Sequence, residues 1–224
     1  MLTGVRLVCV ADTHLYEPEE VPEGDVLIHA GDMLRRGTLD ELELFVTWLH
    51  AQSHRHRLVV AGNHDWCFAR EPEQARQRLG DGVLYLQDAE VTIEGVRIWG
   101  SPWQPEFYAW AFNLPRGEAL AEKWALVPSG VDVLVTHGPP HGYGDRTWHG
   151  PQGCEALRAA LPRIAPALHV FGHIHEDGGV WTEGPTTIAN VTTAEGMRSP
   201  SVFDYDPSTR TVTPISVPPR ELSA

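Results

Sequence analysis

Cysteine is scarce in this 224-residue chain, and the three cysteines, Cys9, Cys67 and Cys154, lie far apart. Their separation gives none of the paired spacings that are typical of zinc ribbons or small disulfide-stapled domains. Cys9 falls in an apolar segment, where a small core residue is expected. The cysteines therefore fit a reducing compartment, and a cytoplasmic location is predicted.

Long apolar runs and an excess of positive charge are also missing. No run of about 18 apolar residues occurs, and no charged segment followed by a long apolar run opens the chain, so neither a membrane span nor a signal peptide is predicted. The formal net charge of −13 argues against a broad nucleic-acid-binding face. The composition, 42% hydrophobic and 21% charged, predicts one globular domain over residues 1–224, with its core at about 5–215.

Apolar segments of strand length alternate with amphipathic segments along the chain, which favours an α/β fold. Buried strands are predicted over residues 5–11, 25–30, 57–61, 131–136 and 169–171. Further short strands are predicted over 83–86, 90–94, 96–99, 179–182, 186–190, 202–205 and 211–215. Helices are predicted over 38–51, 71–79, 118–124 and 154–161.

Each of the five buried strands is followed, directly or after one glycine, by aspartate, asparagine or histidine. The residues concerned are Asp12, His14, Asp32, Asn63, His64, His137, His173 and His175. One such pair alone fits an ordinary turn or helix N-cap. Five strand ends of this kind favour a shared site, because sites in open α/β sheets form beyond the carboxyl ends of the strands.

These side chains offer oxygen and imidazole donors without a thiolate, which suits Mn²⁺, Fe²⁺ or Zn²⁺. Seven ligands are too many for one ion but suit two ions that share a bridging carboxylate. Two divalent ions with the carboxylates of Asp12 and Asp32 give a net charge of about +2, so the site should attract an anion such as phosphate. Paired metals can generate hydroxide and stabilise an in-line displacement.

With their flanking residues, these strand ends resemble the calcineurin-like metallophosphoesterase superfamily from residue 5 to about residue 190. The runs at 24–32, 100–103, 110–113, 135–140 and 171–176 are more similar still to the small metallophosphoesterase-domain-containing proteins first noted in brain and their bacterial relatives. The resemblance implies a four-layer α/β/β/α sandwich, with two mixed sheets flanked by helices.

The resemblance also implies a role for each candidate site residue. One metal would be held by Asp12, His14 and His175 and the other by Asn63, His137 and His173, with Asp32 as the bridge. His64 would contact a phosphate oxygen and protonate the leaving group, or only stabilise the charged phosphate, while metal-bound hydroxide attacks phosphorus in line.

The function that follows is a phosphodiesterase acting on small phosphate esters, with cyclic nucleotides as the expected substrates. A phosphomonoesterase, or a protein that binds AMP or GMP with negligible turnover, is the alternative. Protein Ser/Thr phosphatases of the superfamily carry an acidic residue three positions after the bridging aspartate, where it orients the catalytic histidine. This chain has Arg35 there, followed by Arg36, so that partner of His64 is missing. The two arginines either contact phosphate or are solvated.

Residues 100–117 combine five aromatic side chains with three prolines. This composition fits a loop that packs on itself, or a loop in which Trp103 or Phe112 forms a stacking wall for a nucleobase. A further group of histidines, His50, His54 and His56, lies at the polar end of the helix predicted over 38–51 and is expected to be solvated.

Overall fold

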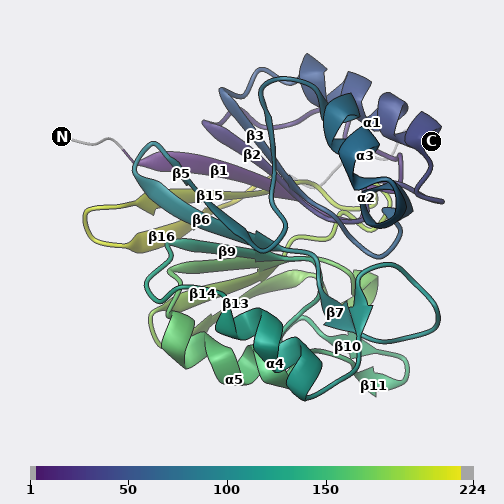
Figure 1. Cartoon of the computed structure of the whole chain (residues 1–224). Coiled ribbons are helices and arrows are strands. Elements are labelled where there is room, and N and C mark those ends of the chain that lie inside the picture. The colour runs from purple at the N-terminus through teal and green to yellow at the C-terminus, as the bar shows by residue number, and fades with distance from the viewer. Residues whose placement is uncertain (1–3, 218–224) are drawn as a thin grey trace.

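Two six-stranded mixed sheets lie face to face, and helices cover the outer face of each (Figure 1). The computed structural model describes residues 4–217, so the ends of the predicted domain, residues 1–3 and 218–224, lie outside the described residues. The four-layer α/β/β/α sandwich expected from the sequence is confirmed.

Each sheet has parallel strands at its centre and antiparallel strands at an edge. The first sheet has the order β16-β15-β1-β2-β3-β4 and the second β13-β14-β12-β9-β6-β5. The first contains β1 (Val5–Val10), β2 (Val26–Ala30), β3 (His56–Val60), β4 (Val83–Tyr85), β15 (Ser201–Asp206) and β16 (Thr211–Ile215). The second contains β5 (Ala89–Ile93), β6 (Val96–Ser101), β9 (Val133–Thr136), β12 (Leu168–Phe171), β13 (Gly179–Glu183) and β14 (Thr186–Asn190).

The helices divide between the two outer faces (Figure 1). Helices α1 (Leu39–Ala51), α2 (Trp66–Arg70) and α3 (Pro72–Leu79) cover the first sheet, and α4 (Glu118–Ala125) and α5 (Glu155–Ile164) cover the second. Helix α2 was not predicted, because five residues are too few to show a helical period. Helix α5 runs past Pro162 to a left-handed cap at Ala165, beyond the predicted end at residue 161, although proline inside a helix removes a hydrogen bond and crowds the preceding turn.

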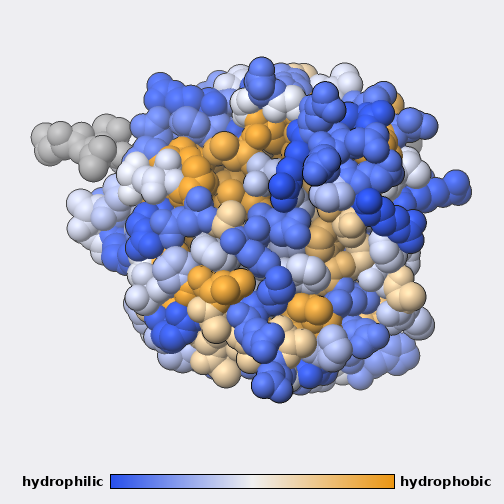
Figure 2. Space-filling model, in the orientation of Figure 1, coloured by the Kyte–Doolittle hydropathy of each residue, from blue (hydrophilic) through white to orange (hydrophobic). Residues whose placement is uncertain are grey.

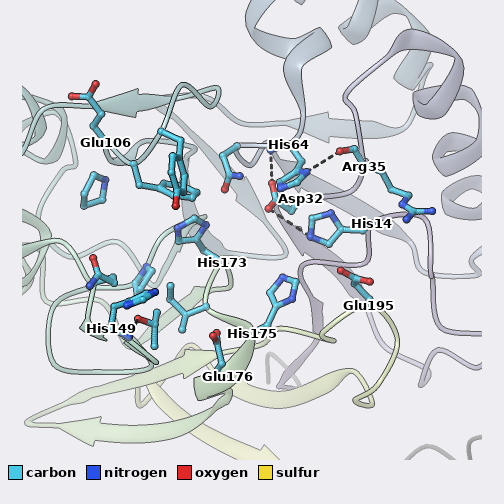
Figure 3. Close-up of a pocket in the computed structure, with 18 of the residues that line it drawn as sticks. His14, Asp32, Arg35, His64, Glu106, His149, His173, His175, Glu176 and Glu195 are labelled. Carbon is cyan, nitrogen blue, oxygen red and sulfur yellow. Dashed lines mark hydrogen bonds and ion pairs between the residues drawn. The ribbon is translucent and has the colours of Figure 1, made fainter.

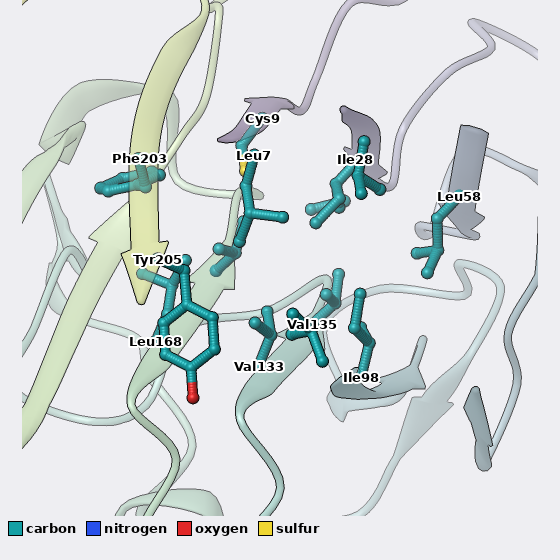
Figure 4. Close-up of a cluster of buried hydrophobic side chains, with 14 of the residues drawn as sticks. Leu7, Cys9, Ile28, Leu58, Ile98, Val133, Val135, Leu168, Phe203 and Tyr205 are labelled. Atoms are coloured by element: carbon teal, nitrogen blue, oxygen red, sulfur yellow. The ribbon is translucent and has the colours of Figure 1, made fainter. Parts of the chain in front are cut away.

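The central core lies between the two sheets (Figure 4). Leu7, Ile28 and Leu58 of the first sheet face Ile98 and Val133 of the second, and all five are fully buried. Alternate residues of the same strands pack against the outer helices. Burial on both faces explains why these strands read as continuous apolar runs.

One expectation about the histidines after α1 is wrong. His54 is buried, and its Nε2 lies 3.0 Å from the backbone oxygen of Pro22, so the chain near Pro22 covers it. Most of the face in Figure 2 is hydrophilic. Among the described residues no helix is both long and apolar enough to span a bilayer.

Two short ribbons stand beside the carboxyl ends of the second sheet's strands (Figure 1). One pairs β7 (Gln104–Pro105) with β8 (Asn113–Leu114), and the other pairs β10 (Arg146–Thr147) with β11 (Gly150–Pro151). A 3₁₀ turn at His175–Asp177 follows β12. These ribbons and the turn form the walls around the strand ends.

Candidate active site

The structure brings all seven predicted ligands together beyond the carboxyl ends of β1, β2, β3, β9 and β12. Three groups have donor atoms within 4.8 Å of one another: Asp12, His14 and His175; Asp32, His137 and His173; and His14, Asp32 and His64. Asn63 joins the second group, with its Oδ1 3.0 Å from Nε2 of His137.

Asp32 lies between the two sets of ligands. Its Oδ2 is 3.4 Å from Nε2 of His137 in one set and 3.7 Å from Nε2 of His14 in the other. Figure 3 shows Asp32 between His14 and His64 at the centre of the site. This position is the one that a bridging carboxylate needs.

Several ligands adopt a backbone conformation that side chains other than glycine rarely take. Asp12, His14, Asp32 and His173 have φ values of 55°, 47°, 56° and 72°. Each such residue costs about 1–3 kcal/mol and persists only where the surrounding structure imposes it. Here the N–H of Asp12 donates to Gly31 O at 2.9 Å, which joins the ends of β1 and β2. Four of the seven predicted ligands are therefore held in a strained backbone conformation.

Two glycines make room for the ligands. A Cβ on Gly31 would lie 2.3 Å from Nδ1 of His137, and a Cβ on Gly62 would lie 2.3 Å from Oδ1 of Asp32. Any larger residue at either position would displace a ligand. The Gly-Asp and Gly-Asn pairs in the sequence therefore reflect close packing of backbone against the site.

Backbone carbonyls orient three of the imidazole rings. The Nδ1 atoms of His14, His137 and His64 lie 3.0, 3.0 and 2.8 Å from the carbonyl oxygens of Leu34, Ala30 and Arg35. A carbonyl oxygen only accepts, so each Nδ1 carries a proton and each Nε2 is the ring nitrogen left to face the site. His64 therefore has an orienting partner after all, because the carbonyl of Arg35 takes the place of the missing carboxylate.

The charge states also suit metal ions. Burial lowers the pKa of His14, which keeps this imidazole neutral. Burial opposes ionisation of Asp32, but His137 and His14 hold its pKa well below the usual range. Burial also acts to lower the pKa of His137, yet the Asp32 carboxylate raises it to about 9. A metal ion must displace that proton, so binding at this set should depend on pH. The ionised carboxylate of Asp32 and the neutral imidazole of His14 fit divalent ions, and His137 fits them once its extra proton has left.

An open cavity of about 1310 Å³ lies above the ligands. Arg35 and Arg36 line it, but Trp103 and Phe112 do not. The indole N–H of Trp103 donates to Asp88 at 2.9 Å, and Phe112 is buried. Phe107 and Tyr108 of the same segment line the cavity instead, together with Trp148.

Two residues near the ligands were not singled out from the sequence. Asp65 accepts hydrogen bonds from the loops that carry Asp32 and Asn63, and the ring of Trp110 stacks on His64. Asp65 stands directly after His64 in the Gly-Asn-His-Asp motif, and this position is the sequence signal that could have identified it. The structure shows that its carboxylate is fully buried. Trp110 opens the run at 110–113 that carries the family resemblance, but Trp103 and Phe112 lie in such runs as well, so the sequence does not distinguish it from them.

The family model for calcineurin-like phosphoesterases matches residues 5–177. The chain belongs to this family. It is 47% identical over 211 residues to human metallophosphoesterase domain-containing protein 1, with 83% of this chain and 65% of the human protein covered. UPF0046 protein K07C11.7 of Caenorhabditis elegans is 41% identical over 204 residues, with 83% of this chain and 69% of that protein covered. The chain therefore spans just under two thirds of the human relative.

Solved structures support the same fold. One crystal structure superposes with a TM-score of 0.72 at 14% identity and covers 95% of this chain and 98% of its own. The crystal structure of TT1561 of Thermus thermophilus gives a TM-score of 0.62 at 13% identity, with the same coverage. Membership of this family implies divalent metals, and the aspartate and histidine clusters at the strand ends fit them.

Proposed function

We propose that this protein is a metal-dependent phosphodiesterase that hydrolyses small phosphate esters, cyclic nucleotides among them. The observation that carries the proposal is the position of Asp32 between two sets of ligands on the floor of an open cavity. Paired divalent ions provide a nucleophile derived from water and stabilise both ends of an in-line displacement at phosphorus. Asp12, His14 and His175 would hold one ion, and Asn63, His137 and His173 the other.

The charge around the cavity favours a diester over a monoester. A phosphate monoester carries a charge of about −1.5 to −2 at neutral pH, whereas a diester carries a single negative charge. Besides Asp32, four glutamates line the same cavity and outnumber its three arginines: Glu41, Glu106, Glu176 and Glu195 against Arg35, Arg36 and Arg116. The Arg35 guanidinium lies 5.3 Å from the centre of the Tyr16 ring and, in Figure 3, points away from Asp32. A singly charged ester suits this balance better than a dianion.

The aromatic rim favours an ester with a flat ring. Tyr108 and Trp148 line the cavity from different loops and are 86% and 91% exposed. Large aromatic side chains so open to solvent offer faces on which a nucleobase can stack, for about 1–3 kcal/mol per base. Phe107 lies deeper, with its ring 5.1 Å from that of His173. A nucleotide is therefore the expected substrate class, with the base at the rim and the phosphate at the ligands.

His64 would donate the proton to the leaving oxygen. Its Nε2 faces the cavity, and its Nδ1 is held by the carbonyl of Arg35 at 2.8 Å. That carbonyl accepts from Nδ1 whether Nε2 is protonated or not, so the ring keeps its orientation before and after the proton moves. General acid catalysis of this kind contributes about 10²–10⁴-fold to the rate.

A substrate panel tests the proposal on metal-free protein reloaded with Mn²⁺, Fe²⁺ or Zn²⁺. Bis-p-nitrophenyl phosphate should be hydrolysed with a kcat/KM at least about tenfold above that of p-nitrophenyl phosphate, a difference of about 1.4 kcal/mol in the barrier. Cyclic 2′,3′- and 3′,5′-nucleotides extend the panel. A preference for the monoester would make the protein a phosphomonoesterase. Equally slow turnover by wild type and His64→Ala with every ester would make it a nucleotide-binding protein.

A further inference from the structure

The imidazole of His64 is held on three sides. Its Nδ1 donates to the carbonyl of Arg35 at 2.8 Å. The rings of His64 and His14 meet edge to face, with their centroids 4.6 Å apart. The indole of Trp110 covers one face, with centroids 4.2 Å apart and an angle of 27° between the planes. Stacked aromatic rings at this separation are worth about 0.5–1.5 kcal/mol beyond the area they bury. Only Nε2 is left to face the cavity.

Trp110 is firmly supported. The N–H of its neighbour Ala111 donates to the carbonyl of Asn63 at 3.2 Å, which ties the aromatic segment to the loop that carries His64. The side chain of Gln104 donates to the carbonyl of Ala111 at 3.3 Å, and its backbone N–H donates to Phe112 O at 3.2 Å. These hydrogen bonds hold the backbone beside Trp110, so its indole keeps a fixed position relative to His64.

A free His64 ring would have a competing position. In the observed position a ring nitrogen of His64 already lies within 4.8 Å of donor atoms of His14 and Asp32, a grouping that could hold a metal ion if the ring turned further toward it. An imidazole that turned toward this grouping would be lost to the substrate. Trp110 is half-buried and does not line the cavity, so it acts on the reaction only through the ring it covers.

We propose that Trp110 is a positioning residue, which stacks on His64 and holds its Nε2 toward the leaving oxygen of the ester. The inference rests on the proposed hydrolase function, but it holds for any ester that the protein hydrolyses. The aromatic segment then serves the site in two ways, since Phe107 and Tyr108 line the cavity while Trp110 fixes the proton donor.

A double-mutant cycle with two diesters tests this role. Trp110→Leu should lower kcat for diphenyl phosphate about tenfold to hundredfold and leave KM within about twofold, since a small misplacement of a catalytic group has effects of this size. Bis-p-nitrophenyl phosphate should lose less, because its leaving group needs little protonation. In a His64→Ala background, Trp110→Leu should have no further effect. An equal loss in both backgrounds, or a change confined to KM, would overturn the proposal.

Two further variants control the cycle. Trp110→Phe keeps a ring over His64 and should retain most of kcat. The small decrease in kcat that it causes should be absent in a His64→Ala background. This variant can therefore replace Trp110→Leu in the cycle if Trp110→Leu fails to fold. Trp48→Leu removes a half-buried indole from α1, whose N–H donates to Pro18 O. It should keep the wild-type kcat, and an equal loss there would show that the effect is not specific to His64.

Nuclear magnetic resonance gives a test that does not depend on turnover. In the zinc-loaded protein, the resonances of the His64 ring protons should be shifted upfield by the indole of Trp110. These resonances are assigned by their disappearance from the spectrum of His64→Ala. They should move downfield in Trp110→Leu, and unchanged shifts would refute the stacking. If wild type hydrolyses no ester at all, the proposed function fails, and these shifts still decide whether Trp110 holds the ring.

Discussion

The carboxylate of Asp65 accepts a hydrogen bond from the backbone N–H of Asp32 at 3.0 Å. The same carboxylate accepts from the N–H groups of Gly62 at 2.7 Å and Leu34 at 3.0 Å. Asp65 is fully buried, so these donors have no access to solvent as an alternative. One side chain thus fixes the loop after β2 to the loop after β3, and with them Asn63 and the carboxylate of Asp32, the proposed bridge.

Asp65→Asn should loosen the site without removing a ligand. Both carboxylate oxygens of Asp65 accept hydrogen bonds from backbone N–H groups. In Asp65→Asn the side-chain NH₂ group replaces one of these acceptors and leaves at least one buried N–H without a partner, which costs about 1–3 kcal/mol. Metal affinity should fall about tenfold to hundredfold, as it does when partners of metal ligands are removed. Denaturant unfolding and metal titration measure the two effects. Asp81→Asn, on the exposed turn after α3, should change neither; a wild-type metal affinity in Asp65→Asn would contradict the role.

Gly62→Ala should disturb the shared ligand. The new Cβ would lie 2.3 Å from Oδ1 of Asp32 and 2.7 Å from the His137 ring, far closer than atoms can pack. Metal content measured by mass spectrometry should fall below two ions per chain, with a loss of activity of at least about tenfold. Gly4→Ala is the control, because its nearest neighbour is the Tyr205 carbonyl at 3.3 Å. Two tightly bound ions in Gly62→Ala would rule out the steric argument.

The sequence predicted the fold and the convergence of the ligands for the same reason. Strands buried on both faces produce apolar runs, and the ends of parallel strands lie at one edge of a sheet, so Asp32 and His137 could be placed together although 105 positions separate them. The prediction of a shared site depended on polar residues that recur at the ends of the strands. Each of these signals is local in the chain.

The parts that could not be predicted depend on contacts between distant segments. Main-chain carbonyls leave no trace in the sequence, so the acceptor at Arg35 was invisible while the arginine side chain suggested that none existed. The aromatic segment was recognised, but Trp103 and Trp110 look alike until the β7–β8 ribbon decides which one points at His64. His54 likewise appeared polar and exposed until the chain near Pro22 covered it.

Single substitutions should separate the two proposed metal sites. His175 belongs to the set with Asp12, and His173 to the set with Asp32. His175→Ala and His173→Ala should each retain one tightly bound ion, whereas Asp32→Ala should weaken both, because its carboxylate borders both sets. Calorimetric titration of metal-free protein with Mn²⁺ or Zn²⁺ counts the sites. Two sites remaining in Asp32→Ala would show that the carboxylate does not bridge.

His169 should make the protein sensitive to acid independently of the metals. It is fully buried in β12, and its Nε2–H donates to the hydroxyl of Thr136 at 2.9 Å, which in turn donates to Gly138 O. Burial lowers the pKa of His169 from about 6.5 to about 3. Below pH 6.5 the unfolded chain therefore binds a proton that the folded protein excludes, so stability falls as the pH falls toward 3.

The free energy of unfolding of metal-free wild type should accordingly decrease by about 2–3 kcal/mol between pH 6.5 and 4.5 on account of this residue, at about 1.4 kcal/mol per pH unit. His169→Gln has no ionisable group there, so its stability should fall by that much less over the same range, even if it starts lower at pH 7. Urea unfolding in the presence of a chelator measures both proteins without a contribution from metal loss. Parallel pH dependences for the two proteins would show that His169 is protonated in the folded state.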